Sequence, residues 1–199
     1  MTMTADAAAP IRCPWCGDLD IYVRYHDTEW GVPLHDDRAL FELLILEGAQ
    51  AGLSWLTILK RREGYRAAYD GFDPARVAGY DATKLAALAE DARIIRNKAK
   101  IRASVANAKG FLAIQEAFGS FDAYLWRFVD GRPIVNHFSA LHQVPATTPL
   151  SETISRDLKS RGFSFVGPTC VYAFLQSAGL VNDHLTGCFR HKELAGAAK

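Results

Sequence analysis

The chain has 199 residues, 49% of them hydrophobic, and a formal net charge of +1 at pH 7. This apolar content is enough for one sizeable core, and the balanced charge excludes a basic field over the whole molecule. Any nucleic-acid binding must therefore come from local patches. The candidates are residues 60–62, residues 93–102, and Lys159 with Arg161, although a solvated helix face is the simpler explanation for each.

Residues 1–11 are mostly small or polar, and we predict that they form a disordered N-terminal extension. The segment lacks the cationic start and apolar run of a secretory signal. No stretch has the composition of a membrane-spanning helix, so we expect a cytoplasmic protein. In that compartment the four cysteines are better explained as metal ligands or free thiols than as disulfides.

A C-x-x-C pair, Cys13 and Cys16, follows the extension, and no second such pair completes a zinc site. His26 comes thirteen positions after Cys13, and far along the chain His184 and Cys188 lie four apart, on one face of a helical turn. Cys13, His26, His184 and Cys188 would complete a closed structural zinc site and fasten both ends of the chain. Spacing alone leaves open that these are unrelated thiols and surface histidines, and Cys16 and His191 are spare candidates.

Residues 21–31 are rich in aromatic side chains, including Tyr22, Tyr25 and Trp30, and Trp15 lies shortly before them. Aromatic residues usually belong to the core. Because this group lies beside the C-x-x-C pair, it could instead line a flat pocket for a planar ligand.

Residues 36–50 give the clearest helix, which Asp36 or Asp37 would cap and which is apolar over most of its length. Glu47 falls at the end of the apolar run. Such a carboxylate is either exposed at a helix end or desolvated, and a desolvated one needs a partner or a chemical task. A Gly-broken turn then presents Trp55 near Glu47, and a second helix follows.

The remaining pattern is helical. Asp73 and Pro74 predict a helix start, residues 83–88 a short helix, and residues 94–115 one long amphipathic helix. Ser120 would cap a further helix, and residues 131–149 are predicted to form a loop. No alternating strand pattern and no internal repeat occur, so the fold class is all-α.

Residues 151–160 predict a short helix with Ser151 as its N-cap. Gly162 and Gly167 bracket a turn, after which Pro168 opens a helix that Gly179 ends. Unpaired N–H groups at the start of that helix would suit a backbone phosphate, although an ordinary helical hairpin is the simpler explanation. Residues 162–182 carry no charge, yet their polar content argues against a membrane span.

Three separated segments together resemble the 3-methyladenine DNA glycosylase I family, in the helix-hairpin-helix DNA glycosylase superfamily. They are residues 25–33, residues 46–55, and residues 161–169 with 179–184. The segments agree with the family in order and spacing, and the resemblance extends over about residues 12–190. It implies a single helical glycosylase domain over residues 12–190, with residues 191–199 as a C-terminal tail.

The resemblance also implies roles for individual residues. One structural zinc ion per chain would be held by Cys13, His26, His184 and Cys188. The base pocket would comprise Trp15, Tyr22, Tyr25, Glu47 and Trp55, and the DNA backbone would lie against Gly162, Ser164, Gly167 and Thr169. Two departures are the long extension and Cys16, a second thiol beside a zinc ligand. Related glycosylases use an Asp after the hairpin helix as their catalytic group, but this family departs from that pattern, so the role of Asp183 stays open.

The implied activity is excision of 3-methyladenine from alkylated double-stranded DNA by a monomeric, monofunctional enzyme, since no lysine is clearly placed for a Schiff base. Adenine methylated at N3 is cationic and a good leaving group, so selection matters more than acid catalysis. Stacking would offset part of the cost of base flipping, and a cation–π interaction would favour the charged base. Glu47 would accept hydrogen bonds from the exocyclic amine, and whether it also orients the attacking water is open.

Two other functions fit parts of the sequence. A non-catalytic, zinc-stapled helix-hairpin-helix module could bind damaged or branched DNA, and it would need no buried Glu47. A zinc hydrolase would need an open coordination position, which four protein ligands would close.

Overall fold

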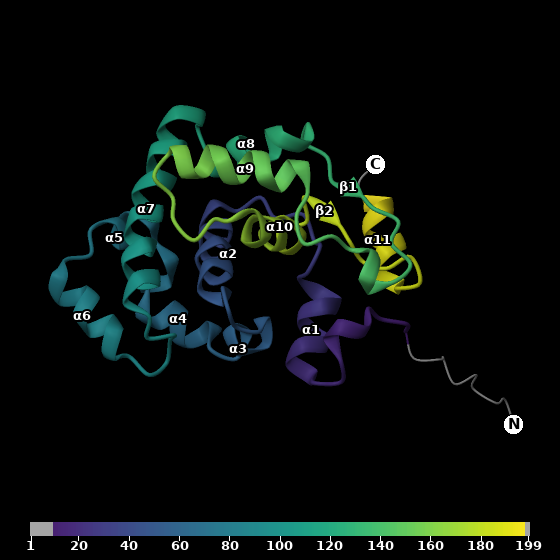
Figure 1. Cartoon of the computed structure of the whole chain (residues 1–199), viewed down its shortest axis with the longest axis horizontal. Coiled ribbons are helices and arrows are strands. Elements are labelled where there is room, and N and C mark those ends of the chain that lie inside the picture. Colours follow the sequence, from purple (N-terminus) through teal and green to yellow (C-terminus); the bar gives the residue numbers. More distant parts are fainter. Residues whose placement is uncertain (1–9, 198–199) are drawn as a thin grey trace, which may run out of the picture.

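The computed structural model describes residues 10–197, so most of the predicted disordered extension lies outside the described residues (Figure 1). In chain order the elements are η1 Pro14–Cys16, α1 Asp20–Thr28, α2 Asp37–Gln50, α3 Trp55–Leu59, α4 Arg62–Ala68, η2 Asp70–Phe72, α5 Pro74–Ala78, α6 Ala82–Glu90, α7 Lys98–Phe118, α8 Phe121–Trp126, η3 Arg127–Val129, β1 Ile134–Val135, η4 Leu141–Gln143, α9 Pro149–Ser160, α10 Pro168–Ser177, β2 Val181–Asn182 and α11 Phe189–Ala197. The predicted helical class is confirmed.

Helix α2 lies in the middle of the molecule and is buried on all sides. Its N-cap is Asp36, whose carboxylate accepts a hydrogen bond from the backbone N–H of Ala39 at 2.8 Å. Every residue from 40 to 49 is buried, including Glu42, which interrupts the predicted apolar run, and Glu47, which ends it. Helices α3, α7, α8 and α10 pack around α2, so its C-terminal end lies inside the protein.

The structure moves two predicted helix starts. Helix α9 begins at Pro149 and not at Ser151, because Thr148 caps it: Thr148 Oγ1 accepts from the backbone N–H of Ser151, and Ser151 Oγ accepts from that of Thr148. Helix α7 begins at Lys98, several residues after the predicted start, because the side chain of Asn97 caps its first N–H groups. Local side-chain capping fixes these boundaries.

Helices α9 and α10 form the predicted pair around a glycine-containing turn. Gly162 has a φ of +87°, which reverses the chain after α9, and Pro168 is the first residue of α10, as predicted. Helix α9 lies above α10 in Figure 1 and packs against it, and α10 also packs against α2. The turn and the end of α2 are therefore held next to each other.

Two short strands lie in segments where the sequence predicts none. β1 and β2 pair in parallel, with Ile134 opposite Val181 and Val135 opposite Asn182. Strands of two residues are too short to show an alternating pattern, so periodicity could not reveal them. Their pairing brings Asn136 within 2.6 Å of Asp183, from Nδ2 to Oδ1.

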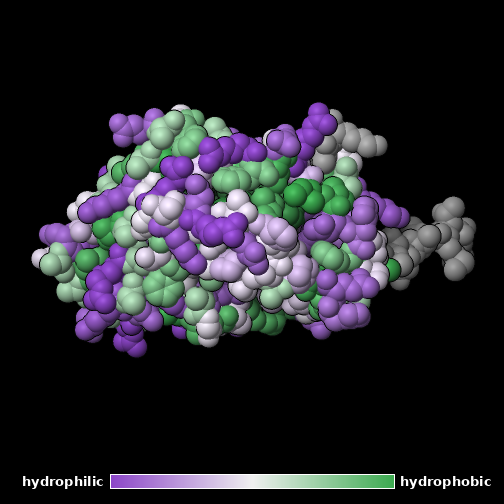
Figure 2. All heavy atoms as spheres, turned by 45° about the horizontal axis from the view of Figure 1, so that its top comes forward, coloured by the Kyte–Doolittle hydropathy of each residue, from purple (hydrophilic) through white to green (hydrophobic). Residues whose placement is uncertain are grey.

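The ends of the described chain meet on one side of the molecule. Helices α1 and α11 lie at one end of the long axis in Figure 1, and α5, α6 and α7 lie at the other. Helix α11 continues across the boundary predicted at residue 190, and His191 on it is buried. Hydrophilic residues are spread over the face in Figure 2, with hydrophobic residues in small groups between them. None of the helices of residues 10–197 combines the length and the apolar character that crossing a membrane requires.

We predict that Gly179→Ala destabilises the protein by at least about 2 kcal/mol. Gly179 has a φ of +74°, and a Cβ atom there would lie 2.4 Å from the carbonyl carbon of Val32. Gly196→Ala is the matched control, because no atom of the described residues outside its own helix turn lies within 4 Å of a Cβ at Gly196. Chemical denaturation should show a lower free energy of unfolding for Gly179→Ala only. Equal stabilities of the two variants would contradict the close packing of Gly179 against Val32.

Candidate functional site

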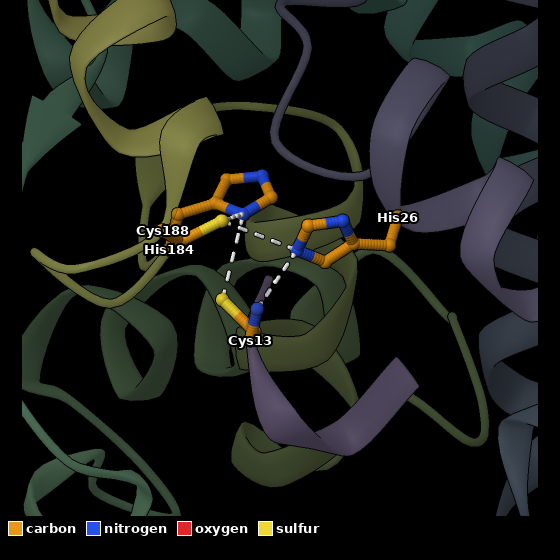
Figure 3. A group of neighbouring side chains, drawn as sticks. All are labelled: Cys13, His26, His184 and Cys188. Atoms are coloured by element: carbon orange, nitrogen blue, oxygen red, sulfur yellow. Dashed lines mark hydrogen bonds between the residues drawn. The ribbon is translucent and has the colours of Figure 1, made fainter. Parts of the chain in front are cut away.

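Four predicted metal ligands from both ends of the chain come together in the interior. Cys13 precedes η1, His26 lies on α1, and His184 and Cys188 follow β2. All four are buried, and their ligand atoms lie within 4.8 Å of one another. Their side chains point toward a common centre in Figure 3. The cluster could hold a metal ion.

The distances within this cluster fit a tetrahedral metal site. Cys13 Sγ lies 3.6 Å from His184 Nδ1, and Cys188 Sγ lies 3.4 Å from His26 Nε2 and 3.6 Å from His184 Nδ1. Zinc–sulfur and zinc–nitrogen bonds of about 2.3 and 2.1 Å at tetrahedral angles give a sulfur–nitrogen separation of about 3.6 Å. The donor set therefore matches the chemistry and the size of a zinc site.

Outer hydrogen bonds orient the two imidazole rings. His26 Nδ1 lies 2.7 Å from Asp27 Oδ1, and His184 Nε2 lies 2.9 Å from the carbonyl oxygen of Trp30. Each ring can donate its outer N–H to that acceptor, which leaves the inner nitrogen unprotonated, as a metal ligand must be. Asp27 is itself held by Arg12 through hydrogen bonds of 2.7 to 3.0 Å. The surroundings thus favour the metal-binding tautomers.

The spare candidates lie outside this cluster. Cys16 is buried, and its thiol donates to the carbonyl oxygen of Cys13. His191 Nε2 lies 2.8 Å from the carbonyl oxygen of Asn136. Among the described residues, Cys13 and not Cys16 is the thiol of this segment that joins the group.

All five residues predicted for the base pocket line one cavity of about 220 Å³, which we call the aromatic pocket. These residues are Trp15, Tyr22, Tyr25, Glu47 and Trp55. Trp15 contacts Tyr22 edge-on at 5.1 Å between ring centroids, and Tyr25 lies 5.4 Å from Trp55. Flat apolar walls of this kind suit a planar ring system.

Glu47 is buried in the wall of the aromatic pocket, with 4% of its surface exposed. Burial raises the pKa of its carboxyl group to about 8, although a hydrogen bond from Ser177 acts in the opposite direction. Glu47 Oε2 and the indole nitrogen of Trp55 are buried, and neither has a hydrogen-bond partner among the described residues. Such groups are rare in proteins, and each needs an explanation, such as a catalytic role or a bound polar group. Of the two alternatives for Glu47, the desolvated one is confirmed.

Sequence reasoning missed several residues of the pocket wall. Ala173, Gln176 and Ser177 lie three and four positions apart on α10, so they share one helix face. That spacing could have predicted a common face, but not that the face turns toward Glu47. Leu141 and Val144 come from the segment predicted as a loop, where no pattern pointed to the pocket.

Asp183 is buried at the edge of the pocket, and hydrogen-bond donors contact both of its carboxylate oxygens. It accepts hydrogen bonds from the hydroxyl of Tyr172, from Gln176 Nε2 at 2.8 Å and from Asn136 Nδ2 at 2.6 Å. These bonds fix the side chains around it. Asp183 therefore holds the side chains of the pocket wall together.

The turn between α9 and α10 presents some of its predicted DNA contacts outward and uses others internally. The backbone N–H of Ser164 donates to Asn107 Oδ1 at 2.8 Å, so it is not a free donor. Gly167 is the N-cap of α10 and provides no side-chain cap, and Thr169 lies in the first turn of that helix. The start of α10 is thus the part of the turn best suited to an anion.

The basic patches are partly neutralised within the protein. Arg62 donates to Glu42 at 2.6 Å and also pairs with Glu29, and Arg161 donates to Asp157 at 2.8 Å. Lys159 is exposed beside the turn. Of these predicted patches, the one at the turn lies closest in the chain to the start of α10.

We predict that Glu47→Gln becomes more stable relative to wild type as the pH rises. The carboxyl ionises near 4.5 in the unfolded chain but keeps its proton up to about pH 8 in the folded protein. Wild-type stability should therefore fall between about pH 4.5 and 8. The neutral amide of the variant does not titrate, so position 47 contributes no such loss there. The difference should reach a few kcal/mol in urea denaturation, on the order set by the pKa shift. Parallel stability curves would show that Glu47 ionises freely.

Comparison with known proteins identifies the family. The chain matches the family model described as methyladenine glycosylase over residues 15–191. It is 49% identical over 177 residues to the DNA-3-methyladenine glycosylase of Haemophilus influenzae (89% of this chain, 96% of the relative) and 46% identical over 177 residues to DNA-3-methyladenine glycosylase 1 of Escherichia coli (89% and 95%). A solved structure of 3-methyladenine DNA glycosylase I from Staphylococcus aureus, which describes 3-methyladenine recognition, has 40% sequence identity to this chain. The match covers 89% of this chain and 95% of the solved one, with a TM-score of 0.87. The chain therefore belongs to the methyladenine glycosylase family.

Proposed function

We propose that this chain is a base-excision repair enzyme that hydrolyses the N-glycosidic bond of 3-methyladenine in alkylated DNA. The observation that carries the proposal is the aromatic pocket with a buried, half-partnered carboxyl group in its wall. The named activity of the relatives supports the same conclusion, because the two sequence relatives align with this chain over nearly their whole length and the solved structure superposes on it over nearly all of its own.

The aromatic pocket would select the damaged base by shape and charge. Trp15, Tyr25 and Trp55 would stack on the flipped base, and each stacking contact is worth about 1 to 3 kcal/mol. Cation–π attraction adds about 0.5 to 2 kcal/mol for a cationic base, which neutral adenine would lack. Glu47 Oε2, left without a partner, would accept a hydrogen bond from the exocyclic amine.

The reaction would be monofunctional hydrolysis. Water would attack the C1′ carbon of the sugar and release one proton to solvent, and the cationic base would leave as a neutral base with the electron pair of the glycosidic bond. Among the described residues that line the pocket, none is a lysine. The ammonium group of Lys100 donates to the carbonyl oxygens of Ala49 and Ala51, at 2.8 and 2.6 Å, at the end of α2. This contact gives Lys100 a structural task and supports the absence of a Schiff-base intermediate.

The turn between α9 and α10 would bind the DNA backbone next to the pocket. The start of α10 would place backbone N–H groups and the positive end of the helix dipole near a phosphate. Ala173, Gln176 and Ser177 on the same helix line the pocket, so one element would connect backbone binding with base recognition.

The Cys and His cluster would hold one structural zinc ion. Four protein ligands close the coordination sphere, so the ion supplies stability and leaves no position for an activated water. This closed sphere argues against the zinc hydrolase. The buried Glu47 argues against a non-catalytic DNA-binding module, which would have no use for a desolvated carboxyl group.

We predict that the protein releases 3-methyladenine but leaves 7-methylguanine in methylated duplex DNA. Released bases would be resolved by chromatography. Glu47→Gln should fold and release the base at least about tenfold more slowly, because the charge-assisted hydrogen bond is lost. If neither protein releases a base although both bind DNA, the glycosylase assignment is wrong. If Glu47→Gln is as fast as wild type, only the role of Glu47 fails.

We predict that Cys188→Ser lowers the zinc content well below one ion per chain and reduces thermal stability. Cys16→Ser is the matched control: Cys16 is equally buried but lies outside the cluster, so this variant should keep its zinc. Metal content after dialysis and thermal unfolding with and without a chelator would test both. Full zinc content in Cys188→Ser would remove this residue from the site, and loss of zinc in Cys16→Ser would indicate that Cys16 is a ligand.

A further inference from the structure

Ser177 connects three helices through its hydroxyl group. It lies near the end of α10, and its Oγ donates a hydrogen bond to Glu47 Oε1 on α2 at 2.8 Å. The same Oγ accepts a hydrogen bond from the hydroxyl of Tyr25 on α1 at 3.1 Å. All three side chains are buried, and all three line the aromatic pocket. The hydrogen bonds therefore run in one direction, from Tyr25 through Ser177 to Glu47.

This arrangement makes the two oxygens of the Glu47 carboxyl group unequal. Oε1 is held by Ser177, whereas Oε2 is buried and has no hydrogen-bond partner within residues 10–197. Since Tyr25 donates to Ser177, the serine proton is directed to Glu47 and not back to the tyrosine. The carboxyl group is thus fixed in rotation, with one oxygen used inside the protein and one left for a ligand.

We propose that Ser177 is a positioning residue for base excision, which fixes Glu47 Oε1 and favours the ionised carboxylate when the cationic base enters the pocket. The inference rests on the role proposed for Glu47. Ser177 touches Glu47 and need not touch the base, and its effect passes through the carboxyl group.

Few charged groups near Glu47 could perform the same task. Tyr22 and Tyr25 on α1 and Cys170 on α10 face the carboxyl group, and burial raises the pKa of each, so they are neutral at neutral pH. Asp183 lines the same pocket but is a carboxylate occupied by its three donors. On α3 the neighbour is Trp55, and Lys100 on α7 binds backbone carbonyls.

The balance at Glu47 is therefore between burial and one hydrogen bond. Burial raises the pKa of Glu47 to about 8, and the hydrogen bond from Ser177 lowers it from the value that burial alone would give. In the empty pocket at neutral pH the carboxyl group is mostly protonated. Entry of a cationic base favours loss of that proton to solvent, after which the carboxylate accepts hydrogen bonds from Ser177 at Oε1 and from the base at Oε2. The rate of excision should accordingly rise with pH and level off above the pKa of Glu47.

We predict that Ser177→Ala shifts this rise to higher pH. The midpoint of the acid limb in single-turnover release of 3-methyladenine should move up by about one pH unit, because a hydrogen bond to a charged group is lost. At pH values below the limb the rate should fall about tenfold, and at high pH it should approach the wild-type plateau. Ser177→Thr, which retains the hydroxyl, should keep the wild-type midpoint. Ser177→Cys, with a weaker donor of similar size, should shift in the same direction as Ser177→Ala.

Ser104→Ala is the matched control. Ser104 is a buried serine on α7 whose hydroxyl donates to the carbonyl oxygen of Ile101 at 2.7 Å, and it does not line the aromatic pocket. Removal of the Ser104 hydroxyl should lower the stability of the protein but leave the midpoint of the pH–rate profile unchanged. The midpoint of the pH–rate profile is read within each variant. A smaller folded fraction lowers all rates of that variant by the same factor and leaves the midpoint unchanged. This comparison separates positioning from folding.

Two outcomes would overturn different statements. If Ser177→Ala and Ser177→Cys keep the wild-type midpoint while Glu47→Gln abolishes the acid limb, Ser177 does not act through Glu47 and this inference alone fails. If Glu47→Gln leaves both the rate and its pH dependence unchanged, the role proposed for Glu47 fails, and the inference fails with it.

Discussion

The burial of α2 on all sides is the constraint on which the rest of the structure depends. An apolar helix of this kind cannot lie on the surface, so helices α3, α7, α8 and α10 must cover it. Two carboxyl groups are buried with it, and they are treated differently. Glu42 receives hydrogen bonds from Arg62 and Arg66, which compensate its charge. Glu47 receives one hydrogen bond, from the neutral hydroxyl of Ser177. The cost of burying its charge is therefore compensated only when a cationic ligand binds.

The Cys and His cluster and the aromatic pocket share a wall. Trp15 and Tyr25 lie next to the ligands Cys13 and His26 in the chain, and the Trp15 ring contacts that of His26 at 5.3 Å. Trp30, another residue of the pocket, contacts the His184 ring at 4.6 Å and accepts its hydrogen bond. A metal ion here would therefore do more than join the chain ends, because it would also hold the aromatic rings in the places where a base would stack.

The fold could be predicted from the sequence wherever the signal is local. The apolar run of α2, the Asp-Pro start of α5 and the Gly-Pro start of α10 gave correct helices, because capping and periodicity act within a few residues. The two-residue pair of β1 and β2 was missed, since its hydrogen bonds join segments more than forty residues apart. The N-cap of α9 was misplaced by three residues, because both Thr148 and Ser151 are good N-caps and only the paired bonds between them decide the boundary.

For the site, the sequence by itself determined the chemistry that is available: two thiols and two imidazoles at the ends of the chain, an aromatic cluster, and a carboxyl group after an apolar run. Motif order determined the family to which they belong. Only the tertiary structure decided that Glu47 is desolvated and not exposed at a helix end, that Cys13 and not Cys16 joins the ligand cluster, and that Ser177 faces Glu47. The reason is physical, since desolvation and hydrogen bonding depend on which distant segments pack together, and residue spacing along a single helix carries no information about that packing.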